Sequence, residues 1–150
     1  MSKDAVILGD RVSVAFENKH VTLYWNPDLQ AIGTWFRPEE FGESWDSSAT
    51  VKEALEGGLE LIREHGATRW IADTREMPVM SAQTQQWVVE QWWPRAFAEG
   101  FRWLAILLPQ STMAKLAVDE AVATAEDSPS HETRYFGEVD AAKAWLRSKA

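Results

Sequence analysis

Three residues that could take part in chemistry follow one another at the end of a short apolar run. The run covers residues 70–72, and Asp73, Thr74 and Arg75 succeed it directly, ahead of a helical pattern that begins at Ser81. In open α/β sheets, ligands gather beyond the carboxyl ends of strands, and helix amino termini attract anions. We therefore expect Thr74, Arg75 and the amides near Ser81 to form an anion or partner site. In the simpler alternative, Asp73 caps loop amides, Arg75 pairs with an acid and Ser81 caps the helix.

Patterns typical of catalysis or of cofactor binding are missing from the sequence. The chain has no cysteine, which excludes disulfides, thiolate metal sites and a cysteine nucleophile. His20, His65 and His131 lie far apart, without the spacing of metal ligands. A phosphoryl-accepting role for Asp73, as in receiver domains, would require a lysine late in the sheet, and the end of the strand expected at 102–108 has none. We predict no catalytic residue, no cofactor and no metal; a hydrolase-like site assembled in space is the less favoured alternative.

Length and charge limit the classes of partner. A chain of 150 residues predicts one domain. The net charge is -8, and segment 39–64 alone carries eight acids against two bases. Such a surface repels a phosphate backbone, so we expect neither nucleic acid nor an anionic membrane as a partner. The longest apolar stretch, 103–108, is far too short to span a bilayer, and the amino terminus has no secretory signal, so a cytoplasmic location is expected.

The elements that position these residues alternate between strands and helices. Period-two patterns predict a leading hairpin, with strands at 12–16 and 21–25. Turn signals and apolar runs predict further strands at 31–36, 69–73, 102–108 and 133–137, and a short leading strand at 6–8. Helices are expected at 49–65, 81 or 82–93, 112–126 and 140–149, the last capped by Asp140. Pro94 lacks an amide and predicts a break or kink at Trp93. The sequence therefore predicts a single-domain α/β fold, with a mixed sheet, strand 102–108 at its centre, and about four helices.

Two glycines mark the helix expected at 49–65. Gly58 falls on its apolar face, where the missing side chain lets the backbone approach the sheet closely. Gly66 is placed to cap the carboxyl end. The acids of this helix form a stripe on the opposite face, at Glu53, Glu56, Glu60 and Glu64. We interpret that stripe as a solvated surface, with a site for a basic partner as the alternative.

Nine tryptophans are a large number for a chain of this length. Trp70, Trp103 and Trp145 lie in or beside apolar patterns and are expected in the core. Trp87 falls instead on the polar side of its helix, between Glu90 and Gln91 on the helical wheel. We expect other parts of the chain to cover Trp87, or a second subunit in a homodimer, or a small molecule in a pocket.

The order of the elements and several segments resemble a known family. The segments are 23–27, Trp35, 70–75, 87–100, 104–109 and 135–146. They are similar to the STAS domain, the fold of bacterial anti-sigma-factor antagonists, and more closely to a group of uncharacterised small bacterial STAS-like proteins. The resemblance implies a partner-switching domain in which a serine at the start of the helix after the strand is phosphorylated, and Ser81 occupies that place. The fold is also related to the lipid-binding lobe of CRAL-TRIO proteins.

These observations lead to two functional expectations of different classes. The first is a small cytoplasmic regulatory domain of STAS-like type that binds another protein through the loop after Asp73 and the helix from Ser81. Asp73, Thr74, Arg75, Ser81 and Trp87 are its candidate partner or ligand residues. The alternative is a binding protein or sensor for an apolar, lipid-like small molecule, with some of the tryptophans lining a pocket.

Overall fold

In the part of the chain that the structure describes, the sheet has six strands that follow one another in chain order. The computed structural model describes residues 12–18, 20–27, 29–36, 48–77, 81–109 and 131–149. The strands are β1 (Ser13–Glu17), β2 (Val21–Asn26), β3 (Ala31–Phe36), β4 (Arg69–Asp73), β5 (Trp103–Leu107) and β6 (Glu132–Phe136). The pairs β1–β2 and β2–β3 are antiparallel, and the three later pairs are parallel. The expected mixed α/β class is confirmed. The expected central position of β5 is wrong, because the sequential order places β3 and β4 in the middle.

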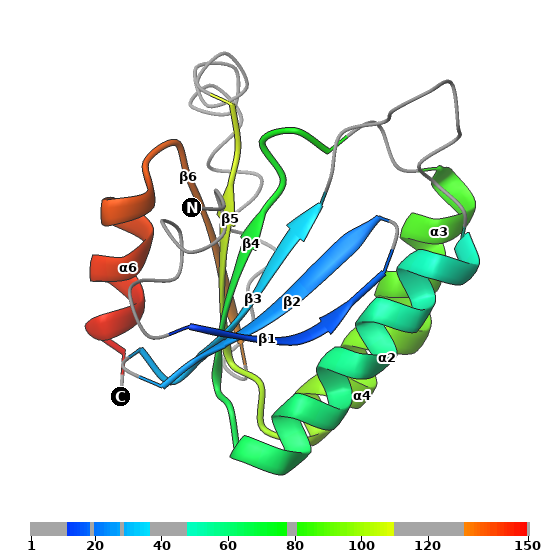
Figure 1. Cartoon of the computed structure of the whole chain (residues 1–150), viewed down its shortest axis with the longest axis horizontal. Coiled ribbons are helices and arrows are strands. Elements are labelled where there is room, and N and C mark those ends of the chain that lie inside the picture. The colour runs from blue at the N-terminus through cyan, green and yellow to red at the C-terminus, as the bar shows by residue number, and fades with distance from the viewer. Residues whose placement is uncertain are drawn as a thin grey trace.

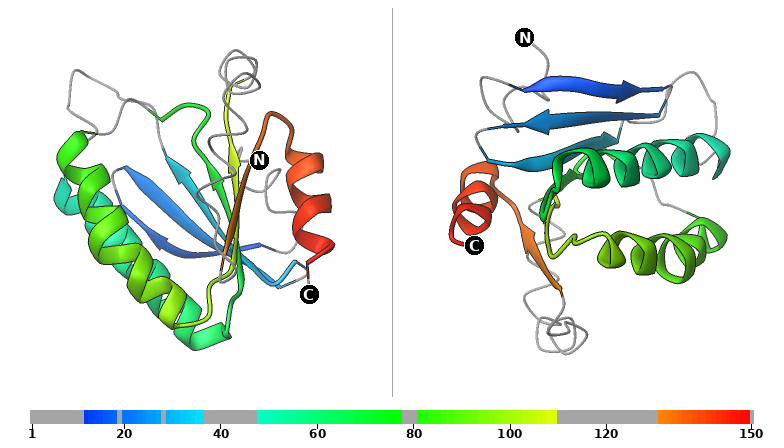
Figure 2. Two further views of the ribbon diagram at one scale, coloured as in Figure 1. Left: turned by 180° about the vertical axis from the view of Figure 1, so that it is seen from behind. Right: turned by 90° about the horizontal axis from the view of Figure 1, so that it is seen from below.

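Helices cover both faces of this sheet. They are α2 (Ser48–His65), α3 (Ala82–Trp87), the π-helical turn η1 (Val88–Trp92), α4 (Trp93–Ala98) and α6 (Val139–Arg147). The helix α2 and the continuous run α3–η1–α4 lie on one face, and α6 lies on the other (Figures 1 and 2). The described residues thus contain three helical segments rather than the expected four. The helix expected at 112–126, the strand expected at 6–8 and residues 37–47 lie outside the described part of the chain.

Alternation along the strands divides the core into two clusters. Trp70 and Ala72 of β4 point toward α2, whereas Ile71 between them points toward α6. The larger cluster also contains Leu23, Ile32 and much of the apolar face of α2. The smaller cluster joins Tyr24, Ile71, Ala105 and Leu107 to α6. Strands β3 and β4 are therefore buried on both sides, as expected where helices cover both faces of a parallel region.

The contact between α2 and the sheet depends on the missing side chain of Gly58. A Cβ atom at this position would lie 2.3 Å from Cη2 of Trp70, much closer than carbon atoms approach one another. The indole of Trp70 is 2 % exposed and occupies the space that a side chain would need. Gly66 ends the helix at φ +64°, with its amide and that of Ala67 donating to Ile62 O. Both glycine predictions are confirmed.

Of the break or kink expected at Trp93, a break is not found, because the helical run continues to Ala98. The irregularity at this place is the π-helical turn η1. A proline ring clashes with the carbonyl four residues earlier in an α-helix. Here the helix widens into η1 just before the proline, and Trp93 N donates to Val88 O, five residues back. Arg95 Nε donates to Gln91 O at 2.9 Å and satisfies one more carbonyl beside the proline. The proline is thus accommodated by a π-helical turn without breaking the helix.

One polar residue marks the start of α6, and another marks the turn before β2. The cap of α6 is Glu138 rather than Asp140, which lies in the first turn of the helix. The polar turn before β2 has a structural role, because Asn18 Oδ1 accepts hydrogen bonds from the amides of His20 and Val21. Asn18 Nδ2 also donates to Thr50 O at 2.7 Å, which ties the hairpin to the first turn of α2.

Candidate ligand-binding pocket

A cavity of about 240 Å³ lies between the sheet and the helical run α3–η1–α4. It is found where β3 and β4 reach their carboxyl ends, which is the edge at which ligand sites of open α/β sheets occur. The described residues that line it are Thr34, Phe36, Leu55, Trp70, Ala72, Thr74, Met77, Gln85, Val88, Val89, Trp92, Trp93 and Leu104. None of these residues carries a charge.

Small side chains on the sheet create the floor of the pocket. Thr34 of β3 pairs in register with Ala72 of β4, and Thr74 follows two residues later on the same face. Trp70 precedes Ala72 by two residues on β4, and Phe36 follows Thr34 by two residues on β3. The small side chains therefore lie between two large ones along the strand direction. The hollow therefore follows from the order of side-chain sizes along two neighbouring parallel strands.

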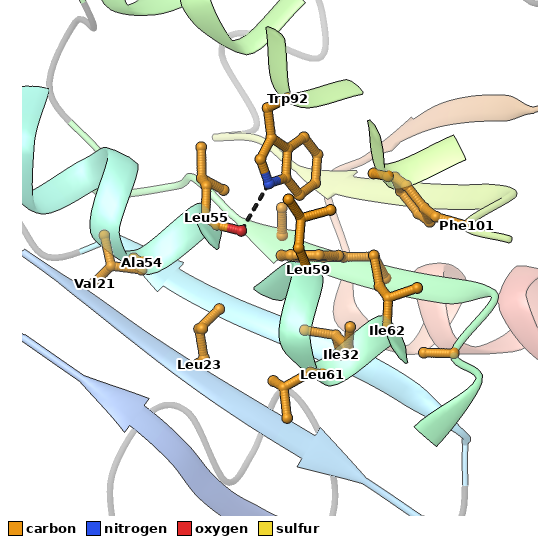
Figure 3. Packing of buried hydrophobic residues seen from close by; sticks show 14 of the residues in the cluster. Val21, Leu23, Ile32, Ala54, Leu55, Leu59, Leu61, Ile62, Trp92 and Phe101 are labelled. Atoms are coloured by element: carbon orange, nitrogen blue, oxygen red, sulfur yellow. Dashed lines mark hydrogen bonds between the residues drawn. The ribbon is translucent and has the colours of Figure 1, made fainter. Parts of the chain in front are cut away.

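The π-helical turn η1 forms the opposite wall. Val88, Val89 and Trp92 of η1 line the pocket together with Trp93, the first residue of α4. Trp92 is 3 % exposed and its Nε1 donates to Leu55 O at 2.7 Å (Figure 3). Its ring also meets Trp70 edge to face, with centroids 5.2 Å apart. The wall is thus held at a defined distance from α2 and the sheet.

Two hydroxyl groups supply the polar character of the floor. Thr34 Oγ1 accepts a hydrogen bond from Trp70 Nε1 at 3.2 Å. Thr74 Oγ1 donates to Leu107 O at 2.7 Å, and Thr74 N donates to the same oxygen at 3.1 Å. The only other polar side chain among the described lining residues is that of Gln85 on α3. A mainly apolar pocket with a few fixed polar groups is the usual form of a small-molecule site.

The structure separates Asp73 and Arg75 from this pocket. Asp73 is 1 % exposed and precedes Thr74, so alternation turns its side chain to the face covered by α6. Arg75 donates from Nε and Nη2 to the two carboxylate oxygens of Asp73, at 3.0 and 3.1 Å. That hydrogen bonding raises the pKa of Arg75, partial burial lowers it, and the charges of Asp73, Glu76 and Glu138 raise it further. The guanidinium is therefore already neutralised by its neighbour.

Ser81 and Trp87 are placed on the helical run but have structural contacts. Ser81 Oγ accepts from Thr84 N at 3.2 Å, which is the bond of an N-cap residue. Trp87 is half-buried, with Lys52 Nζ of α2 5.3 Å from its ring centroid and Arg95 Cζ 6.0 Å away. Residues of α2 and α4 thus cover Trp87 in part. Of the five candidate residues, only Thr74 lines the pocket.

A histidine within hydrogen-bond distance of a hydroxyl occurs elsewhere in the described residues. His20 Nδ1 contacts Thr50 Oγ1, between the turn before β2 and the first turn of α2. His20 is 7 % exposed, and neither residue lines the pocket. The acidic stripe of α2 is partly paired, since Arg95 Nη1 donates to Glu56 at 3.0 Å and Arg63 binds Glu60 and Glu99. The stripe is accordingly a solvated face with surface ion pairs.

Comparisons with known proteins do not assign this chain to a family. No family model matches it, and neither curated proteins nor solved structures give a significant match. The resemblance to STAS and CRAL-TRIO domains therefore stays a prediction. No helix in the described ranges is long and apolar enough to cross a membrane.

Proposed function

We propose that this protein is a cytoplasmic binding protein or sensor for a small, uncharged and mainly apolar molecule. The observation that carries the proposal is the cavity of about 240 Å³ between the sheet and η1, whose described walls hold no charged side chain. Burial of apolar surface supplies about 25 cal/mol per Å², so an apolar ligand gains free energy on entering. Two hydroxyls on the floor, those of Thr34 and Thr74, would orient it.

The size of the cavity limits the size of the ligand. An apolar cavity of about 150 Å³ holds benzene. In proportion, about 240 Å³ accommodates roughly ten non-hydrogen atoms. A micromolar dissociation constant corresponds to about -8 kcal/mol, or about 0.8 kcal/mol for each of ten atoms, which is below the ceiling for small ligands. Micromolar binding is therefore within the range that molecules the size of a substituted benzene can reach.

A substitution that fills the pocket with a larger side chain tests this function. The side chain of Ala72 lines the floor and is 9 % exposed, so Ala72→Leu places three further carbon atoms in the cavity. Ala98→Leu is the matched control, because Ala98 is exposed on α4 and does not line the pocket. The probe is 4-phenylbutan-2-one, an uncharged molecule of suitable size, and tryptophan fluorescence reports its binding.

The expected result is saturable binding to the wild type and to Ala98→Leu, and loss of at least tenfold in affinity for Ala72→Leu. Thermal unfolding of all three proteins shows that the variants remain folded. Binding that is unchanged in Ala72→Leu, or that does not saturate below millimolar concentrations in the wild type, contradicts the proposal. A native mass spectrum of the purified wild type would also identify a molecule retained from the cell.

A regulatory role in binding another protein, implied by the STAS resemblance, is a second proposal. Its support is the exposure of Ser81 and of Val89, which is 56 % exposed on the same helical run. A pull-down from lysate with wild type and a Thr74→Ala/Arg75→Ala/Ser81→Ala variant tests it, and identical partner lists count against this surface. A homodimer through Trp87 remains a prediction. If it forms, Trp87→Glu should shift the protein from dimer to monomer in sedimentation analysis. A wild type that is already monomeric would contradict the homodimer.

A further inference from the structure

The hydrogen-bonding state of Thr34 is determined by its neighbour. Thr34 is 3 % exposed on β3, and its Oγ1 accepts from Trp70 Nε1 at 3.2 Å. An indole N–H is a donor only, so it uses a lone pair of the hydroxyl and leaves the hydroxyl hydrogen. No acceptor for that hydrogen is found in the part of the chain that the structure describes. The Thr34 hydroxyl therefore presents a buried donor at the floor of the pocket.

The hydroxyl of Thr74 is in the opposite state. Its hydrogen is donated to Leu107 O of β5 at 2.7 Å. A backbone carbonyl is an acceptor only, so the Thr74 hydroxyl is the donor in this hydrogen bond. The lone pairs of Thr74 Oγ1 remain, and the residue lines the pocket. Thr74 thus presents an acceptor beside the donor of Thr34.

The spacing of the two threonines suits one small polar group. Thr34 of β3 is in register with Ala72 of β4, and Thr74 lies two residues further along the chain, just beyond the end of β4 at Asp73. From the strand spacing and the rise per residue, their Cα atoms are about 8 Å apart. The oxygen and nitrogen of an amide lie about 2.3 Å apart, and a hydrogen bond of about 2.9 Å on either side spans up to about 8 Å. Because both side chains project from the same face of the sheet, their hydroxyl oxygens are separated by a comparable distance, and a single amide whose N–H is anti to its carbonyl can bridge them across Ala72.

The geometry points to a ligand of about ten non-hydrogen atoms that carries an uncharged carboxamide on an apolar body. Its carbonyl oxygen would accept from Thr34, and its N–H would donate to Thr74. A carboxylate in the same place would lose its hydration without a cation, since none of the described lining residues is charged. This inference rests on the proposed function and adds the chemical class of the ligand to it.

Three probes of equal shape separate the contributions of donor, acceptor and charge. They are 3-phenylpropanamide, 4-phenylbutan-2-one and 3-phenylpropanoate, which differ only in an amino, methyl or anionic oxygen substituent on the same carbonyl carbon. We expect the amide to bind about fivefold more tightly than the ketone, which corresponds to one neutral hydrogen bond. The carboxylate should bind at least tenfold more weakly than the ketone at pH 7, because its charge is desolvated without a partner.

Two isosteric variants assign these preferences to residues. Thr74→Val removes the acceptor, so it should abolish the advantage of the amide and leave the ketone unchanged. Thr34→Val removes the donor, so it should weaken amide and ketone alike by about fivefold. Thr34→Ser and Thr74→Ser keep the hydroxyls and should keep the wild-type order. Thr34→Val also removes the hydrogen-bond partner of Trp70 Nε1 and could therefore unfold the protein. In that case the comparison of Thr74→Val with Thr74→Ser tests the preference for the amide.

The outcomes separate this inference from the proposed function. If amide and ketone bind equally to the wild type and both are lost in Ala72→Leu, the pocket is a ligand site and the inference is wrong. If Thr74→Val weakens the ketone as much as the amide, the assignment of Thr74 as the acceptor is wrong. If none of the three probes binds, or if Ala72→Leu has no effect, the proposed function fails and the inference fails with it.

Discussion

Replacing Gly58 by alanine would add one methyl group at the closest approach of α2 to the sheet. The new Cβ would lie 2.3 Å from Trp70 Cη2 and 3.0 Å from Cζ3. Optimal carbon contacts are about 3.5 to 4.0 Å long, so the two groups must separate by more than about 1 Å. The indole has little freedom to move, because its Nε1 is hydrogen-bonded to Thr34 and its ring packs against Trp92.

The expected change in the free energy of unfolding for Gly58→Ala is the difference of two opposing effects. Alanine in the middle of a helix is about 1 kcal/mol more favourable than glycine. Overpacking a well-packed core costs about 1 to 3 kcal/mol, and the large overlap at Gly58 places this case at the upper end. We predict that Gly58→Ala lowers the free energy of unfolding by about 2 kcal/mol, which lowers the melting temperature by about 4 to 8 °C.

Gly57→Ala is the matched control in the same helix. Its added Cβ would lie 3.2 Å from Cδ1 of Leu23, the end of a flexible side chain, and 3.7 Å from Cγ of Phe16. The helix-propensity gain should prevail there, so we expect a change between zero and about 1 kcal/mol in the stabilising direction. Urea denaturation at 25 °C, followed by circular dichroism, measures both variants. A Gly58→Ala protein as stable as Gly57→Ala would refute the contact with Trp70.

Three further variants test the helical run beside the pocket. Ser81→Ala removes the cap and should lower the free energy of unfolding by about 1 kcal/mol, whereas Ser81→Asp should not; equal melting temperatures for the two would contradict the cap. Trp92→Phe loses the bond to Leu55 O and should cost about 1 to 3 kcal/mol in urea denaturation, and a change below about 0.5 kcal/mol would contradict it. Pro94→Ala restores an amide, so we expect η1 to tighten to an α-helix. The variant should then have higher thermal stability and bind 4-phenylbutan-2-one at least threefold more weakly. Unchanged binding would show that the π-helical turn does not shape the pocket.

Much of the scaffold could be predicted because it depends on local patterns. Alternating apolar residues predict β2, and the turn signal before residue 31 predicts β3, each within one residue of its observed bounds. The apolar face of α2, its Gly58 and its capping Gly66 were all predictable from helical periodicity and from the special role of glycine. The N-cap role of Ser81 follows from residue type in the same way. Each of these features involves neighbours in the sequence.

The pocket depends on contacts that a single sequence does not reveal. Thr34 lies on β3 and Thr74 just beyond β4, with the whole of α2 between them in the chain, so their proximity requires the register of β3 with β4. Pro94 predicts a break or kink at Trp93, but residue type alone does not distinguish these from a wider π-helical turn that lets the helix continue. Asp73, Thr74 and Arg75 were grouped because they are consecutive, although alternation sends the side chains of Asp73 and Thr74 to opposite faces. The alternation itself was a signal that could have separated them.

The tryptophan indole N–H groups allow the central claim to be tested directly by nuclear magnetic resonance. Trp70, Trp92 and Trp93 line the pocket, whereas Trp103 and Trp145 pack in the cluster on the opposite face of the sheet. In a titration of ¹⁵N-labelled protein with 4-phenylbutan-2-one, we predict saturable shifts of the first group's indole signals, with no change in the second. Shifts that do not saturate, or that are confined to Trp103 and Trp145, would contradict a ligand pocket between the sheet and η1.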